Sequence, residues 1–187
     1  PNHTGCDHIW VESHPEYYAR DEKGNMFGPY DWDDVYKLDY SQQGTRHAMT
    51  DAMKFWLREA DIDGFRCDVA GQVPVDFWNT LRPQLELAAA RPIFMLAEDS
   101  QPVMTERAFD ADYNWPMSAL FNQIAQPPGN VHSPGVMPEK HAADIDSLMR
   151  RQAATFPADS YLMNMTTNHD MNSWEGTEFD RLGKFAP

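Results

Sequence analysis

The segment Asp61–Ala70 reads Asp-Ile-Asp-Gly-Phe-Arg-Cys-Asp-Val-Ala and decides the fold. It predicts a short strand, and because side chains alternate along a strand, Gly64, Arg66 and Asp68 are expected to share one face. Burying charge is costly unless it is paired, so a buried Arg66–Asp68 pair would keep the carboxylate ionised and fixed. Such a carboxylate suits a nucleophile; the plainer interpretation is an ion pair that locks a strand end.

Two later apolar runs also lead to carboxylates. Ile93–Ala97 is followed directly by Glu98, and Tyr161–Met165 is followed after a few residues by Asp170. Helix-length segments separate the runs, which is typical of a parallel α/β barrel. In such a barrel the carboxyl ends of all strands meet on one face, where active sites lie. The sequence therefore predicts Asp68, Glu98 and Asp170 as neighbours in one cleft.

Four motifs resemble, in order and approximate spacing, the regions that define the α-amylase family of glycoside hydrolases: Asn2-His3, Gly64-Phe65-Arg66-Cys67-Asp68, Glu98 and Asn168-His169-Asp170. The resemblance implies an α/β fold, the TIM (β/α)8 barrel. We expect residues 1–187 to form a partial catalytic barrel, from about the end of strand 3 to just past strand 7. Because an incomplete barrel cannot close, the isolated fragment is expected to be inactive.

The resemblance also implies a retaining mechanism on α-glucosidic bonds. Asp68 would be the nucleophile, Glu98 the general acid and base, and Asp170 would hold the hydroxyls of the reacting sugar. Glu98 follows an apolar strand and lies among carboxylates, which should raise its pKa and suit it to donate a proton. Four further residues are expected to contact or support the sugar: His3, Arg66, His169 and Trp174.

The residues after Asp68 bear on calcium. In the family's calcium-dependent α-amylases a Lys-His pair follows the nucleophile, whereas this chain continues with Val69-Ala70-Gly71-Gln72-Val73. The continuation resembles the neopullulanase and cyclomaltodextrinase branch, so we expect no cofactor, with Asn2 as the remaining calcium candidate. A metal cluster of His3, Asp7 and His8 is the alternative, but nothing nearby in sequence supplies the outer partners such a site needs.

Residues 4–44 have no clean period and many turn signals, which predicts a long loop or small insertion after strand 3. It would form one wall of the cleft. Its aromatic residues could stack on sugar rings or form the loop's own core: Trp10, Tyr17, Trp32 and Tyr40.

Three amphipathic helices are predicted over residues 45–60, 74–90 and 139–155. Phe55 and Trp56 are placed on the buried face of the first helix, and Met149 and Ala153 on that of the third. Pro83 predicts a kink or an interruption in the second. A surface loop is predicted over residues 126–138, which are rich in proline and glycine.

Composition limits the other classes of function. The net charge of −14 argues against nucleic-acid binding and suits a neutral α-glucan oligosaccharide or polysaccharide as substrate. No apolar run approaches the roughly 20 residues of a membrane span. Two cysteines, Cys6 and Cys67, do not decide the redox compartment, so localisation stays open.

Two other functions are alternatives to the glycosidase. A non-catalytic sugar-binding or transporter-associated barrel of the same family would be expected to lack at least one of the three carboxylates. A metal-dependent barrel enzyme using Glu98, Asp99 and His3 would leave Arg66 and Asn168-His169-Asp170 without a role.

Overall fold

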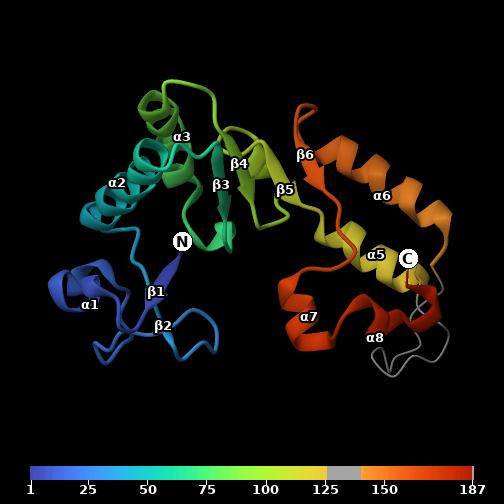
Figure 1. The fold of residues 1–187 in the computed structure, drawn as a ribbon, viewed down its shortest axis with the longest axis horizontal. Coiled ribbons are helices and arrows are strands. Elements are labelled where there is room, and N and C mark those ends of the chain that lie inside the picture. Colours follow the sequence, from blue (N-terminus) through green and yellow to red (C-terminus); the bar gives the residue numbers. More distant parts are fainter. Residues whose placement is uncertain (126–139, 187) are drawn as a thin grey trace.

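The structure is a computed structural model that describes residues 1–125 and 140–186. Its main sheet has four parallel strands that neighbour one another in chain order: β3 (Gly64–Cys67), β4 (Phe94–Ala97), β5 (Ala111–Tyr113) and β6 (Tyr161–Met163). The strands predicted from the sequence are thus confirmed. Their parallel order brings the four carboxyl ends to one edge, toward α7 in Figure 1.

The register of the strands decides which side chains share a face. Arg66 pairs with Leu96, which pairs in turn with Ala111, so Tyr113, two residues further on, lies on the same face as Arg66. Gly64 allows β3 to lie close to β4, because a Cβ at this position would lie 1.8 Å from the carbonyl oxygen of Phe94. A side chain at this position would push β3 off β4.

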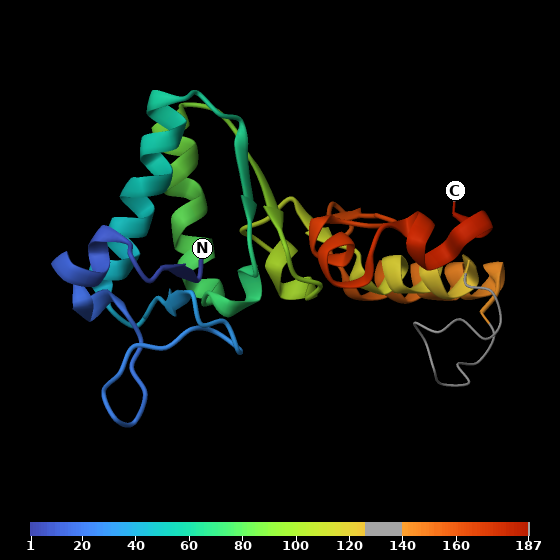
Figure 2. The ribbon, with the colours of Figure 1, turned by 60° about the horizontal axis from the view of Figure 1, so that its bottom comes forward.

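Helices alternate with these strands. Their bounds are α2 (Gln43–Glu59), η2 (Ala70–Gln72), α3 (Val75–Ala89), α4 (Pro102–Thr105), α5 (Trp115–Ala125), α6 (Ala142–Thr155), α7 (His169–Glu175), α8 (Glu178–Leu182) and η3 (Gly183–Phe185). Helices α2 and α3 lie side by side against β3 and β4, and α5 and α6 form a second pair (Figure 1, Figure 2). None of the described helices has the long apolar stretch that a membrane crossing needs.

The main core lies between α2, α3 and the strands. Helix α3 contributes a continuous buried stripe, and the outward face of β3 and β4 supplies Cys67, Met95 and Ala97. Burying a large apolar side chain is worth about 1.5–3 kcal/mol, so this interface dominates the stability of the sheet. The fully buried residues of α3 are Phe77, Trp78, Leu81 and Leu85.

The N-terminal residues form a small unit beside the strand ends. Strand β1 (His3–Gly5) pairs antiparallel with β2 (Val35–Lys37), and between them lie α1 (Ile9–Ser13) and η1 (Pro15–Tyr17). In Figure 1 this unit lies below α2, separate from the main sheet. The loop expected from the sequence thus contains two short helical segments and a strand.

Three helix predictions are wrong in detail. Phe55 and Trp56 are 53% and 54% exposed, because α2 buries the stripe of Met49, Met53 and Leu57 at positions i, i+4 and i+8 instead.

On α6, Leu148 packs against α5, while Met149 and Ala153 lie off that stripe and are exposed. Of the kink or interruption predicted at Pro83, the interruption is absent, because α3 is continuous from Val75 to Ala89 and its buried stripe outweighs one lost backbone hydrogen bond. The predicted loop over residues 126–138 falls outside the described residues.

Candidate active site

A cleft of about 1010 Å³ lies at the carboxyl ends of the strands. Its lining includes Asp68, Glu98 and Asp170, the three carboxylates that the sequence predicted as neighbours. His3 and Trp174 also line it. The cleft therefore gathers residues from both ends of the chain onto the edge of one sheet.

Arg66 connects the first two carboxylates. Its Nη1 lies 2.6 Å from Oδ1 of Asp68 and its Nη2 lies 2.8 Å from Oε1 of Glu98. The side chains of Arg66 and Asp68 are 31% and 40% exposed, so the expectation of a buried pair is wrong. The pair stands at the edge of the open cleft, where a carboxylate remains accessible to a ligand while one guanidinium fixes it.

Glu98 has the more enclosed environment. Its side chain is only 9% exposed, and its Oε2 accepts a hydrogen bond from the Val69 N–H at 3.0 Å. Burial raises the pKa of Glu98 above its ordinary value; the Val69 N–H and the Arg66 charge oppose this, and the neighbouring Asp68 adds to it. Glu98 is thus suited to carry a proton under conditions in which an ordinary glutamate has lost it.

The turn that joins Asp68 to η2 is strained. Val69 has a φ of 41°, in the left-handed region that β-branched residues avoid. Such a conformation costs of the order of 1–3 kcal/mol and persists only where the surroundings impose it. Here the hydrogen bond from the Val69 N–H to Glu98 is one such constraint, so the strained turn ties the two carboxylate-bearing loops together.

Asp170 comes from the first turn of α7. Asn168 caps this helix by accepting the Met171 N–H at 2.8 Å, which fixes the helix start beside the cleft. Trp174 lies one turn further on and is 82% exposed. His169 lies 3.5 Å from Asp170 but is not among the residues that line the cleft, so the structure does not place it with the other predicted sugar contacts.

His3 faces the cleft from β1. Its Nδ1 lies 2.6 Å from Oδ1 of the buried Asn2, so this nitrogen donates and Nε2 is left to accept. Burial is the largest influence on the pKa of His3 and lowers it, which favours the neutral ring. A neutral imidazole held in this way can accept a hydrogen bond from a hydroxyl group.

The loop aromatics separate into two groups. Trp32 lies in the cleft, where its ring meets His3 at 5.3 Å and Tyr30 at 5.2 Å, both centroid to centroid. Tyr40 is buried in the main core, and Trp10 and Tyr17 pack against it. Stacking on a ligand thus remains an interpretation for Trp32, whereas Trp10, Tyr17 and Tyr40 serve packing.

The sequence did not identify several residues of the site. The hydroxyl of Tyr113 accepts a hydrogen bond from Nε of Arg66 at 3.1 Å, and the guanidinium lies 5.6 Å from the centre of its ring. Trp115 and the neighbours of Trp32 within residues 30–35 also line the cleft. Tyr113 ends β5, where the alternation of side chains along a strand could have placed it, whereas the loop residues carry no such signal.

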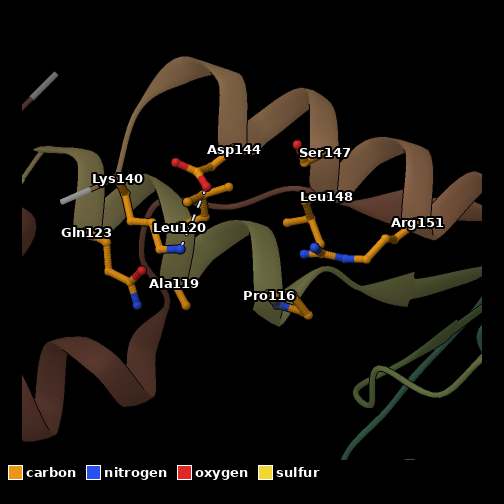
Figure 3. Close-up of a pocket in the computed structure, with 9 residues that line it drawn as sticks. All are labelled: Pro116, Ala119, Leu120, Gln123, Lys140, Asp144, Ser147, Leu148 and Arg151. Carbon is orange, nitrogen blue, oxygen red and sulfur yellow. Dashed lines mark ion pairs between the residues drawn. The ribbon is translucent and has the colours of Figure 1, made fainter. Parts of the chain in front are cut away.

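A second hollow, of about 190 Å³, lies between α5 and α6. As Figure 3 shows, its floor is formed by apolar side chains such as Leu120 and Leu148, and Lys140 pairs with Asp144 at its rim. It has a single carboxylate among its lining residues, so it offers no pair for acid and base work. The cleft at the strand ends is the better candidate for chemistry.

Asn2, the calcium candidate from the sequence, is buried, and its oxygens contact other residues of the chain. Its amide oxygen lies 2.6 Å from Nδ1 of His3, and its main-chain carbonyl accepts the Leu38 N–H at 2.9 Å. Ca²⁺ takes six to eight oxygen ligands, preferably carboxylates. Across residues 1–125 and 140–186, no three His, Cys, Asp or Glu side chains are grouped so that they could hold a metal ion.

Known proteins resemble this chain in sequence. The model of the α-amylase catalytic domain matches residues 7–94. The chain is 33% identical over 86 residues to a cyclomaltodextrinase of Geobacillus thermopakistaniensis, covering 44% of this chain and 14% of that protein. It is 42% identical over 69 residues to a maltogenic α-amylase of Bacillus acidopullulyticus, covering 35% and 11%. The chain thus spans only about a seventh of the length of these relatives.

Solved structures agree over most of the chain. A noncanonic maltogenic α-amylase from Thermotoga neapolitana superposes with a TM-score of 0.74 at 33% identity, over 90% of this chain and 37% of that one. An α-amylase from Lactobacillus plantarum gives a TM-score of 0.75 at 27% identity, over 95% and 43%. The chain is therefore similar to members of the α-amylase family, and its parallel sheet matches part of the TIM-type α/β barrel of these amylases.

Proposed function

We propose that the protein containing this chain is a retaining glycoside hydrolase that cleaves α-glucosidic bonds of starch-derived maltodextrins. The observation that carries the proposal is the Arg66 guanidinium, which contacts an accessible Asp68 and an enclosed Glu98 at adjacent strand ends. Retaining chemistry needs one ionised and one protonated carboxyl on either side of the scissile bond. Two carboxyls in such different environments meet that need.

In this mechanism Asp68 attacks the anomeric carbon while Glu98 donates its proton to the departing glycosidic oxygen. Glu98 then takes a proton from water, which attacks the glycosyl-Asp68 ester from the same side as the leaving group and restores the configuration. Asp170 reaches the cleft from α7 and would hold hydroxyls of the distorted sugar. His3 would accept a further hydroxyl through Nε2.

The aromatic residues suggest where the rest of the glucan binds. Trp32 and Trp174 belong to the lining of the cleft, one from the N-terminal unit and one from α7. The names of two relatives, cyclomaltodextrinase and maltogenic α-amylase, support a maltodextrin as the substrate. We therefore propose α-1,4-linked maltodextrins, with calcium not required.

Trapping the covalent intermediate tests this proposal. The reagent is an α-glucosyl fluoride that carries a second fluorine beside the ring oxygen, which slows hydrolysis of the covalent intermediate. It should label the complete wild-type protein, and peptide mapping should place the added glycosyl mass on Asp68. Asp68→Asn should take up no label. A label on another residue would contradict the assignment. Maltodextrin binding without turnover would favour the non-catalytic barrel.

A further inference from the structure

Asp112 is a buried carboxylate with no part in the mechanism above. It lies in β5, is 0% exposed, and faces the layer between sheet and helices, since it pairs with Ala97 in the register. Its Oδ1 accepts the N–H of Asp99 at 3.0 Å and that of Tyr113 at 2.8 Å. Its Oδ2 is buried without a hydrogen-bond partner. A carboxyl in such a place is costly unless its contacts serve a purpose.

The contact with Asp99 fixes the residue next to Glu98. On the other side, the Glu98 N–H donates to the Cys67 carbonyl at 3.0 Å, and the Glu98 carbonyl accepts the Ala70 N–H at 3.2 Å. The backbone of Glu98 is therefore tied to the turn after β3. Asp112 connects the next residue, Asp99, to β5 through its hydrogen bond with the Asp99 N–H.

The side chain of Asp99 extends the same arrangement. A Cβ on Gly71 would lie 2.5 Å from its Oδ2, so the carboxylate of Asp99 sits directly against the η2 turn. Gln101 donates to both oxygens of Asp99, at 3.3 and 3.0 Å. Movement of the Asp99 backbone would thus disturb the loops that carry Glu98 and Asp68 together.

The charge state of Asp112 is consistent with a holding role. Burial raises its pKa to about 7, against the Tyr113 and Asp99 N–H groups, which lower it. Because its pKa lies near neutrality, the carboxyl carries less negative charge than an ordinary aspartate, and its Oδ1 can accept both N–H groups in either protonation state. An apolar side chain here would leave the Asp99 N–H without its acceptor.

We propose that Asp112 is a positioning residue, which holds the Asp99 N–H so that Glu98 keeps its place opposite Asp68. This proposal rests on the function proposed above for Glu98. A misplacement of about 1 Å at a catalytic group can cost of the order of 100-fold in rate, so one backbone tie is enough to matter.

The test compares Asp112→Leu with Asp112→Asn in the complete protein. Leucine keeps the branched shape at Cγ but offers no acceptor, whereas asparagine keeps an oxygen for both N–H groups. We expect Asp112→Leu to lower kcat by at least about 10-fold with KM within about twofold, and Asp112→Asn to stay within about threefold of wild type. Asp112→Ala replaces the leucine variant if that variant does not fold.

Asp110 is the matched control. It lies two residues earlier on the same strand side, and its Oδ2 accepts the Met95 N–H at 2.8 Å, at the end of β4 away from Glu98. Asp110→Asn should lower the melting temperature and leave kcat within about threefold of wild type. A loss of kcat equal to that of Asp112→Leu would show that any damage to β5 has this effect and would overturn the proposal.

Amide hydrogen exchange gives a readout that does not need activity. The Asp99 amide should exchange faster in Asp112→Leu than in wild type, and at the wild-type rate in Asp112→Asn. Unchanged exchange or unchanged kcat in Asp112→Leu would overturn the proposal, as would equal damage in Asp112→Asn. If wild type cleaves no α-glucan, the proposed function fails, while exchange still decides whether Asp112 holds this turn.

Discussion

Arg66 acts on two carboxyls that need opposite charge states. Its cation favours ionisation of both, yet burial raises the pKa of Glu98 and outweighs the guanidinium there. Asp68 is more exposed and keeps the shorter contact with Arg66, 2.6 Å against 2.8 Å. The difference in environment, rather than in partner, therefore separates the proposed acid from the proposed nucleophile.

The pH profile tests the role of Glu98. A general acid works only while protonated, so a raised pKa keeps it active to higher pH and moves the alkaline limb of kcat/KM upward. We expect this limb well above the ordinary glutamate value of 4.5. A glucosyl fluoride releases a leaving group that needs no proton from Glu98. With this substrate, the alkaline limb of kcat/KM should be absent in Glu98→Gln. A limb that persists in this variant would assign it to another group.

At the scale of single residues, the sequence predicted contacts between side chains that are neighbours along one strand. Alternation placed Arg66 and Asp68 together, and the strand ends indicated Glu98. The contacts of Tyr113 with Arg66 and of Asp112 with Asp99 join positions 47 and 13 residues apart. They depend on the register between strands, which no local pattern in the chain specifies.

At the scale of elements, Arg82 ties α3 to the sheet. It pairs with Asp110 through both terminal nitrogens, and it also donates to the carbonyls of Ala108 and Ile93 at 3.0 Å each. Its side chain is only 16% exposed. One cation therefore satisfies backbone oxygens that precede two neighbouring strands.

Loss of this cation should weaken the packing of α3. Arg82→Ala would leave Asp110 half-buried without its partner and two carbonyls without donors, and we expect a loss of about 3 kcal/mol of stability. The urea midpoint should fall clearly. Arg150→Ala is the control, because Arg150 is 79% exposed and pairs with Asp146, which is 65% exposed, so its midpoint should hardly move. Equal shifts in both variants would show that Arg82 is an ordinary surface cation.

Element prediction failed where two stripes on one helix competed. In α2 the sequence offers an aromatic pair and a stripe of methionine and leucine, and the structure buries the latter. Local periodicity is satisfied by either choice, and only the position of α3 decides between them. The continuous course of α3 through Pro83 has the same origin, since tertiary packing overrides a local preference.

For the whole molecule, the cleft is formed by segments far apart in the chain. His3 and Trp174 are separated by nearly the full sequence and line the same cleft, which the resemblance of the motifs to the α-amylase family had led us to expect. In the wall formed by residues 30–35, the sequence indicated only Trp32, and the rest was expected only as part of a loop. Its side-chain placement depends on contacts across the cleft, such as the 3.1 Å hydrogen bond from Gln72 to the Tyr30 hydroxyl.

Gly71 and Gln72 also bear on the metal requirement of the whole protein. In the calcium-dependent relatives a Lys-His pair links the nucleophile turn to the ion, whereas here Gln72 donates to Tyr30 and Gly71 lies against Asp99. A longer side chain at position 71 would clash with the Asp99 carboxylate at 2.5 Å. The amide oxygen of Asn2 is likewise occupied by His3. Contacts within the protein therefore hold this turn.

We expect the complete protein to keep its activity and melting temperature in excess EGTA, because these contacts replace the ligands a calcium ion would need. Both quantities should be measured before and after chelation, and again after adding Ca²⁺ or Mg²⁺. Gln72→Ala serves as a companion variant: it should loosen the Tyr30 loop equally with and without chelator. A large loss in EGTA that Ca²⁺ alone restores would mean that the protein binds calcium through residues other than this turn.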